Sequence, residues 1–299
     1  MAELKKIIVG HDLRAGGEKA LRSAAVLAKR SGAALRLVHV IEPHHSYQRI
    51  SHPLTLPYTI EEIAQKTGAK LQMLAASPEL AHLQVEYEVR TGKPFVELIV
   101  ARRAWQADLI VVGSASKGAH FLGSTSERVI RKAMVPVMVA KRGLSAGAKI
   151  FLVPTDFSDC ARKAAEEALV LANSFRGRII FFHVVDLYPL YTVAYADEFG
   201  VSVPLPPPAP ELIEREWQDF LSGLPVEKVD WEKYTEEGEA ATTILQQADQ
   251  KHADLIVMGT HGRTGLEYML LGSVAEKIVR RAHCPVLTIR PEAFQFQMP

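Results

Sequence analysis

The chain has 299 residues and a formal net charge of +1 at pH 7; 48% of its residues are hydrophobic and 23% are charged. These values are ordinary for a soluble globular protein, and the near-zero charge gives no general attraction for nucleic acid or for a membrane surface. Two cysteines are too few for a disulfide framework, no apolar run reaches the ~18 residues of a membrane span, and no signal peptide is visible, so we expect a cytoplasmic protein of about two domains.

The first half of the chain alternates between strand and helix patterns. Strands are predicted at 6–10, 34–41, 83–90, 108–112 and 135–140, and helices at 18–31, 59–76, 94–105 and 124–133. His44, His45 and His52 lie in the loop at 42–57 without a second cluster of ligands, so no metal site is expected there. Such alternation predicts a parallel sheet with helices on both faces and ligands beyond the carboxyl ends of its strands.

The second half repeats this alternation. Strands are predicted at 149–154, 178–185, 227–234, 255–258 and 286–289, and helices after Ser158 and at 210–221, 240–248 and 274–282. His183 lies within an apolar strand and is interpreted as a satisfied core histidine. The loop at 187–209 contains three consecutive prolines, 206–208, for which a plain loop or lid is favoured over a docking segment.

The two halves are copies of one unit. Matching positions keep a nearly constant offset: Asp12 and Asp156 (144), His39 and His183 (144), Gly113 and Gly259 (146), Gly123 and Gly272 (149), and Pro136 and Pro285 (149). An offset that changes by small steps indicates two copies of one fold with short insertions. We predict a first domain at 1–142 and a second at 149–292, joined by a flexible linker of small residues.

The most specific pattern is Gly259-x2-Gly262-x9-Gly272-Ser273, directly after the strand at 255–258. Glycines allow the backbone to turn sharply and to approach a bulky anion, and Arg263 supplies a fixed positive charge. Backbone N–H groups at the start of the following helix favour phosphate. A capping box over 273–276 would explain part of the pattern without any ligand. In the same way, Asp156 or Ser158, in the turn after the strand at 149–154, would be explained as a cap of the helix that follows.

This pattern resembles the nucleotide-binding motif of the universal stress protein (UspA-like) family, in its ATP-binding branch. The flanks at 255–262 and 284–289 also resemble that family, and the resemblance covers nearly the whole chain because the unit occurs twice. It implies α/β domains with a Rossmann-like, doubly wound parallel five-stranded sheet of strand order 3-2-1-4-5 in each half. It also implies a stress-response role through binding and signalling, and ATP as the ligand, with Mg²⁺ or Mn²⁺. Carried over residue by residue, the expected ATP site comprises Pro154, Thr155, Asp156, Val185, Met258, Gly259, His261, Gly262, Arg263, Gly272, Ser273 and Val274.

The first copy departs from the motif. Ser116 stands in place of Gly262, Gly10 replaces Pro154, and the loop before Gly123 is three residues shorter. A side chain at Ser116 hinders close approach, and a shorter loop has less backbone to wrap a triphosphate. We therefore expect a degenerate first domain that binds something smaller than ATP or serves as a structural partner.

The resemblance also bears on assembly and on alternative functions. In the family, fifth strands pair across a two-fold axis; here 136–140 and 285–289 would pair within one chain as a pseudo-dimer, with a homodimer as a further option. Slow ATP hydrolysis is the enzymatic alternative, but the chain has no Gly-x4-Gly-Lys-Ser/Thr loop. His261 is the one candidate base, and the glycines around it explain it better as part of the loop, so no catalytic residue is assigned. A ligand-free scaffold is the third alternative.

Overall fold

The computed structural model describes residues 4–43, 59–114, 123–185, 208–262 and 271–290. It divides into two units, the first ending at Ala146 and the second beginning at Gly147. The loops at 44–58 and 186–207, with the three histidines and the first two of the three prolines noted above, lie outside the described residues.

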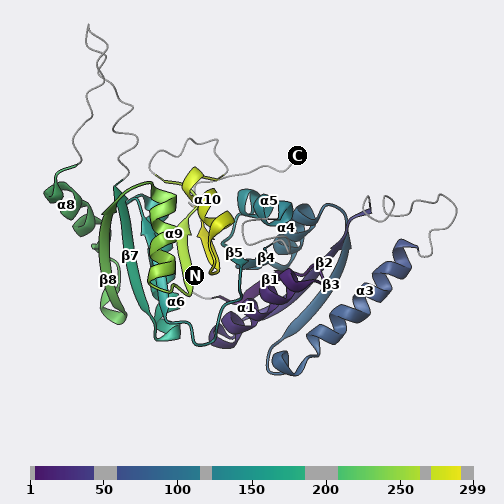
Figure 1. The fold of residues 1–299 in the computed structure, drawn as a ribbon. Helices are drawn as coiled ribbons and strands as arrows, with labels where there is room; N and C mark the ends of the chain where they lie inside the picture. The colour runs from purple at the N-terminus through teal and green to yellow at the C-terminus, as the bar shows by residue number, and fades with distance from the viewer. Residues whose placement is uncertain (1–3, 44–58, 115–122, 186–207, 263–270, 291–299) are drawn as a thin grey trace, which may run out of the picture. The chain divides into compact units, whose positions relative to one another are not determined.

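The first unit is an α/β fold (Figure 1). Its elements are β1 (Lys6–Gly10), α1 (Ala15–Ser31), β2 (Ala34–Ile41), α3 (Ile60–Ala75), a 3₁₀ turn η1 (Pro78–Leu80), β3 (Val85–Thr91), α4 (Pro94–Trp105), β4 (Leu109–Gly113), α5 (Ser124–Lys132) and β5 (Val137–Ala140). Its strands pair in parallel in the order β3-β2-β1-β4-β5, which confirms the predicted order 3-2-1-4-5.

The second unit repeats the arrangement. Its elements are β6 (Ile150–Thr155), α6 (Asp159–Phe175), β7 (Arg178–Val185), α8 (Pro210–Leu221), a 3₁₀ turn η2 (Val226–Lys228), β8 (Asp230–Glu237), α9 (Ala240–Gln250), β9 (Leu255–Gly259), α10 (Ser273–Arg281) and β10 (Val286–Ile289). Its parallel strand order is β8-β7-β6-β9-β10. The tandem doubly wound fold predicted from the sequence is therefore confirmed.

Helices cover both faces of the sheet in the first unit (Figure 1). A Cβ added to Gly10 at the end of β1 would lie 3.0 Å from the Leu98 side chain of α4. The next residue, His11, points to the opposite face, because its Nδ1 lies beside Gly17 of α1. Central strands are consequently apolar on both sides: the four residues of β4 from Leu109 to Val112 are at most 3% exposed.

One aspartate in each unit ties together the starts of neighbouring strands. Oδ2 of Asp108 accepts hydrogen bonds of 2.9 Å from the backbone N–H groups of both Lys5 and Lys6. Oδ2 of Asp254 accepts equivalent bonds of 2.8 and 3.1 Å from Lys149 and Ile150. This shared contact explains why an aspartate precedes the fourth strand in both copies.

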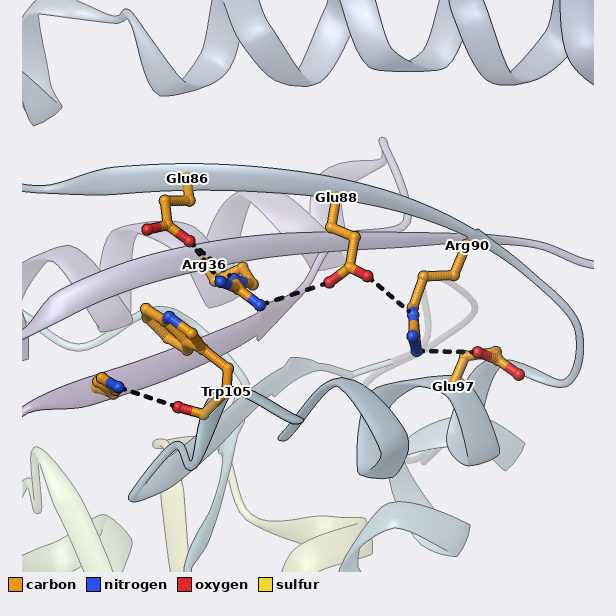
Figure 2. Close-up of polar contacts among 7 residues, drawn as sticks. Arg36, Glu86, Glu88, Arg90, Glu97 and Trp105 are labelled. Atoms are coloured by element: carbon orange, nitrogen blue, oxygen red, sulfur yellow. Dashed lines mark hydrogen bonds and ion pairs between the residues drawn. The ribbon is translucent and has the colours of Figure 1, made fainter. Parts of the chain in front are cut away.

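A charged network fixes α4 against the outer strands of the first unit. Figure 2 shows Arg36 of β2 paired with Glu86 of β3 at 2.6 Å, and Arg90 of β3 paired with Glu97 of α4 at 3.2 Å. The Arg36 guanidinium also lies 4.5 Å from the ring centroid of Trp105, the last residue of α4. The network holds both ends of the helix whose start lines the first unit's cavity, described below.

The structure corrects two local predictions. The third strand of the second unit begins at Asp230 rather than at 227, because Val226–Lys228 forms a 3₁₀ turn, and it continues to Glu237 opposite Val185. The segment expected to be a flexible linker is held at Leu144, which is 4% exposed and whose N–H donates to Ser23 Oγ at 2.9 Å. Pairing of the fifth strands with each other, and a homodimer, stay predictions.

Candidate functional site

The beginning and the end of the glycine-rich loop in the second unit meet at one hydrogen bond. The N–H of Gly272 donates to the carbonyl oxygen of Thr260 at 2.8 Å, and the N–H of Thr260 donates to Ile289 of β10 at 2.8 Å. Thr260 is 1% exposed. The end of β9 and the start of α10 are thereby fixed side by side, although eight residues between them, 263–270, lie outside the described residues.

A cavity of about 200 Å³ opens at this junction. Ten of the twelve predicted site residues line it: Pro154, Thr155, Asp156, Met258, Gly259, His261, Gly262, Gly272, Ser273 and Val274. Arg263 lies outside the described residues. Val185 is not among the lining residues; its carbonyl accepts the N–H of Gly238 at 3.1 Å, and Val184 lines the cavity in its place.

The N-terminus of α10 faces this cavity without a side-chain cap from any described residue. Gly272 is the N-cap residue with extended backbone, and Ser273 is the first helical residue, so the capping box considered over 273–276 does not form. Helices α6 and α9 differ, since Ser158 and Glu239 cap them through bonds of 3.2 and 2.8 Å. The first N–H groups of α10 are therefore donors available to an anion.

Asp156 is oriented by the turn that follows β6. Its Oδ1 accepts hydrogen bonds from the Ser158 N–H (3.2 Å) and hydroxyl (2.6 Å). Its Oδ2 lies against Gly262, where an added Cβ would overlap the carboxylate. Gly262 is thus required for the loop to pass this carboxylate, a packing reason for glycine that needs no ligand; close approach of the backbone to a bound anion stays a prediction.

Gly259 allows a second close contact beneath the cavity. A Cβ there would lie 2.8 Å from Sγ of Cys160, which is 5% exposed. Burial raises the pKa of the Cys160 thiol, so the neutral thiol predominates at pH 7. We assign Cys160 to packing between α6 and the end of β9.

Six further residues that the sequence did not single out complete the cavity, five of them apolar: Ala161, Val184, Ala240, Ile244 and Ala275, with Thr260 as the sixth. Thr260 could have been predicted from the sequence, because it lies between the predicted site residues Gly259 and His261. Ala240 and Ile244 were not, because only the fold places α9 beside the loop. His183, by contrast, is satisfied as predicted: its Nδ1 lies 2.8 Å from the carbonyl oxygen of Thr155, and its ring lies 4.3 Å from that of Phe157.

An ion pair joins α9 to α10 at the rim of the cavity. Lys277 Nζ lies 2.8 Å from Oε1 of Glu239, the residue before the lining residue Ala240. Hydrogen bonds from Lys277 and from the Thr242 N–H lower the pKa of Glu239 to about 2. The rim at these two positions is therefore neutral in net charge.

Among the residues that the structure describes, no group of three or more His, Cys, Asp or Glu side chains is arranged to hold a metal ion. Within the same ranges, no helix is long and apolar enough to cross a membrane.

Two successive α/β units of one strand order, each with a glycine at the end of its fourth strand, define a tandem Rossmann-like protein. The model of the universal stress protein family matches residues 3–141 and 147–290, and the chain belongs to that family. A universal stress protein of Mycolicibacterium smegmatis is 30% identical over 304 residues, covering 95% of this chain and 97% of the relative. One from Methanocaldococcus jannaschii is 38% identical over 146 residues, 48% of this chain and 82% of the relative. The crystal structure of a universal stress protein from Archaeoglobus fulgidus superposes with a TM-score of 0.71 at 23% identity, covering 95% of this chain and 98% of that chain.

Proposed function

We propose that the second unit of this universal stress protein binds ATP and that the protein acts by binding and signalling in the cytoplasm rather than by fast catalysis. The uncapped start of α10 carries the proposal, because it faces a cavity lined by glycines and apolar side chains as well as by the polar residues Thr155, Asp156 and His261. Backbone N–H groups at a helix start suit phosphate, and apolar walls suit a purine ring. In this proposal Asp156 lies against the nucleotide.

A divalent cation, Mg²⁺ or Mn²⁺, is proposed to accompany the nucleotide. Both ions prefer oxygen ligands and are commonly held through substrate phosphates plus one or two carboxylates. Asp156 is the carboxylate that lines the cavity, and the described residues form no all-protein metal cage. The residues present therefore fit a cation that arrives with the phosphates, where it would neutralise their charge.

Slow hydrolysis of ATP remains the alternative chemistry. The candidate base, His261, lines the cavity, and its Nδ1 lies 2.9 Å from the Thr260 hydroxyl. That contact orients the ring within the loop. A steady-state assay of ADP release distinguishes the two functions, since sustained turnover would contradict pure binding.

The proposal is tested by removing one N–H group without removing the helix. Proline is favoured at the first helical position, and Gly272, at φ −67° and ψ 151°, already has the backbone that a following proline requires. Ser273→Pro should therefore keep α10 but lose a phosphate donor. We expect ATP affinity, measured by isothermal titration calorimetry, to fall at least ~10-fold.

The chain supplies its own matched control. Ser124 is the first residue of α5 in the first unit, and its N-cap Gly123 has φ −63° and ψ 144°. Ser124→Pro repeats the same chemical change at the equivalent position outside the proposed ATP site. Unchanged ATP affinity in Ser124→Pro, with loss in Ser273→Pro, supports the second unit as the site; equal affinity in both variants would contradict it.

A further inference from the structure

The net charge of +1 is the sum of two halves with opposite charge. Residues 1–146 contain 21 Lys and Arg against 12 Asp and Glu, a formal net charge of +9, and residues 147–299 contain 14 against 22, a net charge of −8. Opposite charges of this size attract the first unit of one chain to the second unit of another. The internal repeat shows where the first unit concentrates its charge, because most positions have a counterpart in the second.

Helix α4 of the first unit is apolar on more than its inner side. Its first residue and Leu98 line the first unit's cavity, which is about 280 Å³ in volume and lies at the end of β1. Val96 and Val100 do not line this cavity and are only half-buried, and Lys93 and Arg103 are exposed. These four residues follow the spacing i, i+3, i+7 and i+10, which places them in one ridge along the helix. A helix that packs on one side only is normally polar on the other, so the two valines call for an explanation.

The equivalent ridge of α9 in the second unit is polar. At an offset of 146, its four residues are Glu239, Thr242, Gln246 and Asp249. Lys93 and Arg128 stand where the second unit has the ion pair Glu239–Lys277, so the rim of the first cavity is cationic. Lys93 and Arg103 make no ion pair within the described part of the chain. Because α4 and α9 occupy the same place in the same fold, the fold itself does not require the valines and cations of α4.

Helix α5, which packs beside α4, adds an aromatic ring held between two cations (Figure 1). The Arg128 guanidinium and the Lys132 Nζ lie 5.3 and 5.1 Å from the centroid of the Phe95 ring, which belongs to α4 and is half-buried. The second unit has an alanine in place of this phenylalanine. Together with the four ridge residues, these three make up a surface that we name the α4–α5 face. Aromatic and arginine side chains are enriched among the residues that anchor protein interfaces.

Helix α8 of the second unit has the opposite character. Its sequence holds four acids and one base. Trp217 and Phe220 are buried, whereas Leu212 is 53% exposed. Glu216 and Asp219 follow Leu212 at i+4 and i+7, so an apolar side chain and two acids form a ridge along α8. Ridges with these spacings are the features through which two helices pack together.

We propose that the protein associates with itself, the α4–α5 face of one copy docking on α8 of a second copy. The apolar side chains of the face receive Leu212, and its cations meet the acids of α8. A second copy is the partner because this chain supplies both the acidic charge and the exposed leucine. The two surfaces include no fifth strand, and α8 contributes no residue to the cavity proposed for ATP, so the association does not depend on ATP binding.

The test measures self-association of the full chain by sedimentation equilibrium at about 20 mM and about 500 mM salt. We expect association at low salt, with a dissociation constant at least ~10-fold higher at high salt. Val100→Gln and Arg103→Asp each introduce the residue that α9 has at the same position, so both variants should fold, which thermal unfolding checks. Each should weaken association about 10-fold or more at low salt.

Two further variants make the test specific to the face. Lys29→Asp makes the same change of charge as Arg103→Asp, also in the last turn of a helix of the first unit, but outside the face, and should leave association unchanged. Asp219→Arg on α8 should weaken association by itself. Combined with Arg103→Asp it should restore part of the lost affinity, because the opposite charges are then exchanged between the two surfaces.

Each remaining outcome overturns the proposal. The chain could stay monomeric at low salt up to about 100 μM. It could associate in a way that Val100→Gln and Arg103→Asp leave intact, which would assign the contact to another surface. An equal loss in Lys29→Asp would show that total charge, not this face, drives association. Binding of a DNA duplex by the face, in a chain that stays monomeric, would assign the face to nucleic acid. Absence of ATP binding, with salt-dependent association intact, would contradict the proposed function alone.

Discussion

Different residues build the same turn after the first strand of each unit. His11 Nδ1 accepts the Leu13 N–H at 3.0 Å, and Thr155 Oγ1 accepts the Phe157 N–H at 2.9 Å. Leu13 and Phe157 both adopt a positive φ, 56° and 62°. The turn therefore depends on a side-chain acceptor two residues earlier rather than on one residue type. In the first unit, His11 Nε2 is buried and has no hydrogen-bond partner among the described residues.

Gly113, at the end of the fourth strand of the first unit, is predicted to stabilise the fold because it leaves room for close packing, not because its backbone needs a conformation that only glycine adopts easily. A Cβ on Gly113 would overlap the backbone of Gly16, whereas one on Gly32 (φ +74°) would meet nothing within 4 Å. Gly32→Ala should lower the free energy of unfolding by about 1 kcal/mol, the cost of a left-handed backbone. Gly113→Ala should cost at least about twice as much, because backbone must move. Urea unfolding of both variants checks this order; a smaller loss for Gly113→Ala would contradict it.

The Glu239–Lys277 pair should make stability depend on pH in the acid range. The pKa of Glu239 is lowered from 4.5 to about 2 in the folded protein, so its contribution is present above the unfolded pKa and is lost as pH falls through the folded value. Glu239→Gln should cost about 1 kcal/mol or less at pH 7, since the pair is partly exposed. The difference in melting temperature between the wild type and Glu239→Gln should shrink between about pH 4.5 and pH 2. A difference that grows as pH falls would contradict this assignment.

At the scale of elements, each unit fixes its fourth strand by one carboxylate. Asp254 Oδ2 accepts two backbone N–H groups at the start of β6, as Asp108 does at β1. Asp254→Ala should lower the free energy of unfolding by about 1–3 kcal/mol, because two donors lose their acceptor. Asp254→Asn keeps an acceptor oxygen and should cost less. Equal losses in the two variants, measured by denaturant unfolding, would show that charge rather than hydrogen bonding matters.

Element type was largely predictable from the sequence, whereas some boundaries and contacts were not. Buried strands such as β9 and glycine- or proline-marked helices such as α4 have strong local patterns. The start of β8 was predicted at 227, three residues too early. Sequence alone did not distinguish a strand there from the 3₁₀ helix that Val226–Lys228 forms. Leu144 was assigned to a flexible linker because its neighbours are small, and its burial depends on Ser23, 121 residues away.

Most of the candidate site followed from the motif, because its residues are local to two strand ends and one helix start. The rest depends on tertiary structure. Ile244 reaches the cavity only through the placement of α9, and Val184 replaces Val185 because side chains alternate along β7. The first unit appeared degenerate from Ser116 and the short loop. Its cavity became evident only from the fold.

At the scale of the whole molecule, duplication gives one chain two cavities of different charge. The second has a balanced rim and the glycine at 262, and the first has a cationic rim and a shorter loop. The proposed ATP site is accordingly assigned to the second unit alone.

The most direct test is to measure the nucleotide that purified protein carries. The wild type and Gly262→Val are denatured, and the released adenine nucleotide is quantified per chain. We predict about one ATP per chain in the wild type and nearly none in the variant, because a side chain at 262 would overlap Asp156. If the wild type releases no nucleotide and binds none by calorimetry, the ATP-binding account is contradicted; about two per chain would contradict a single ATP site in the second unit.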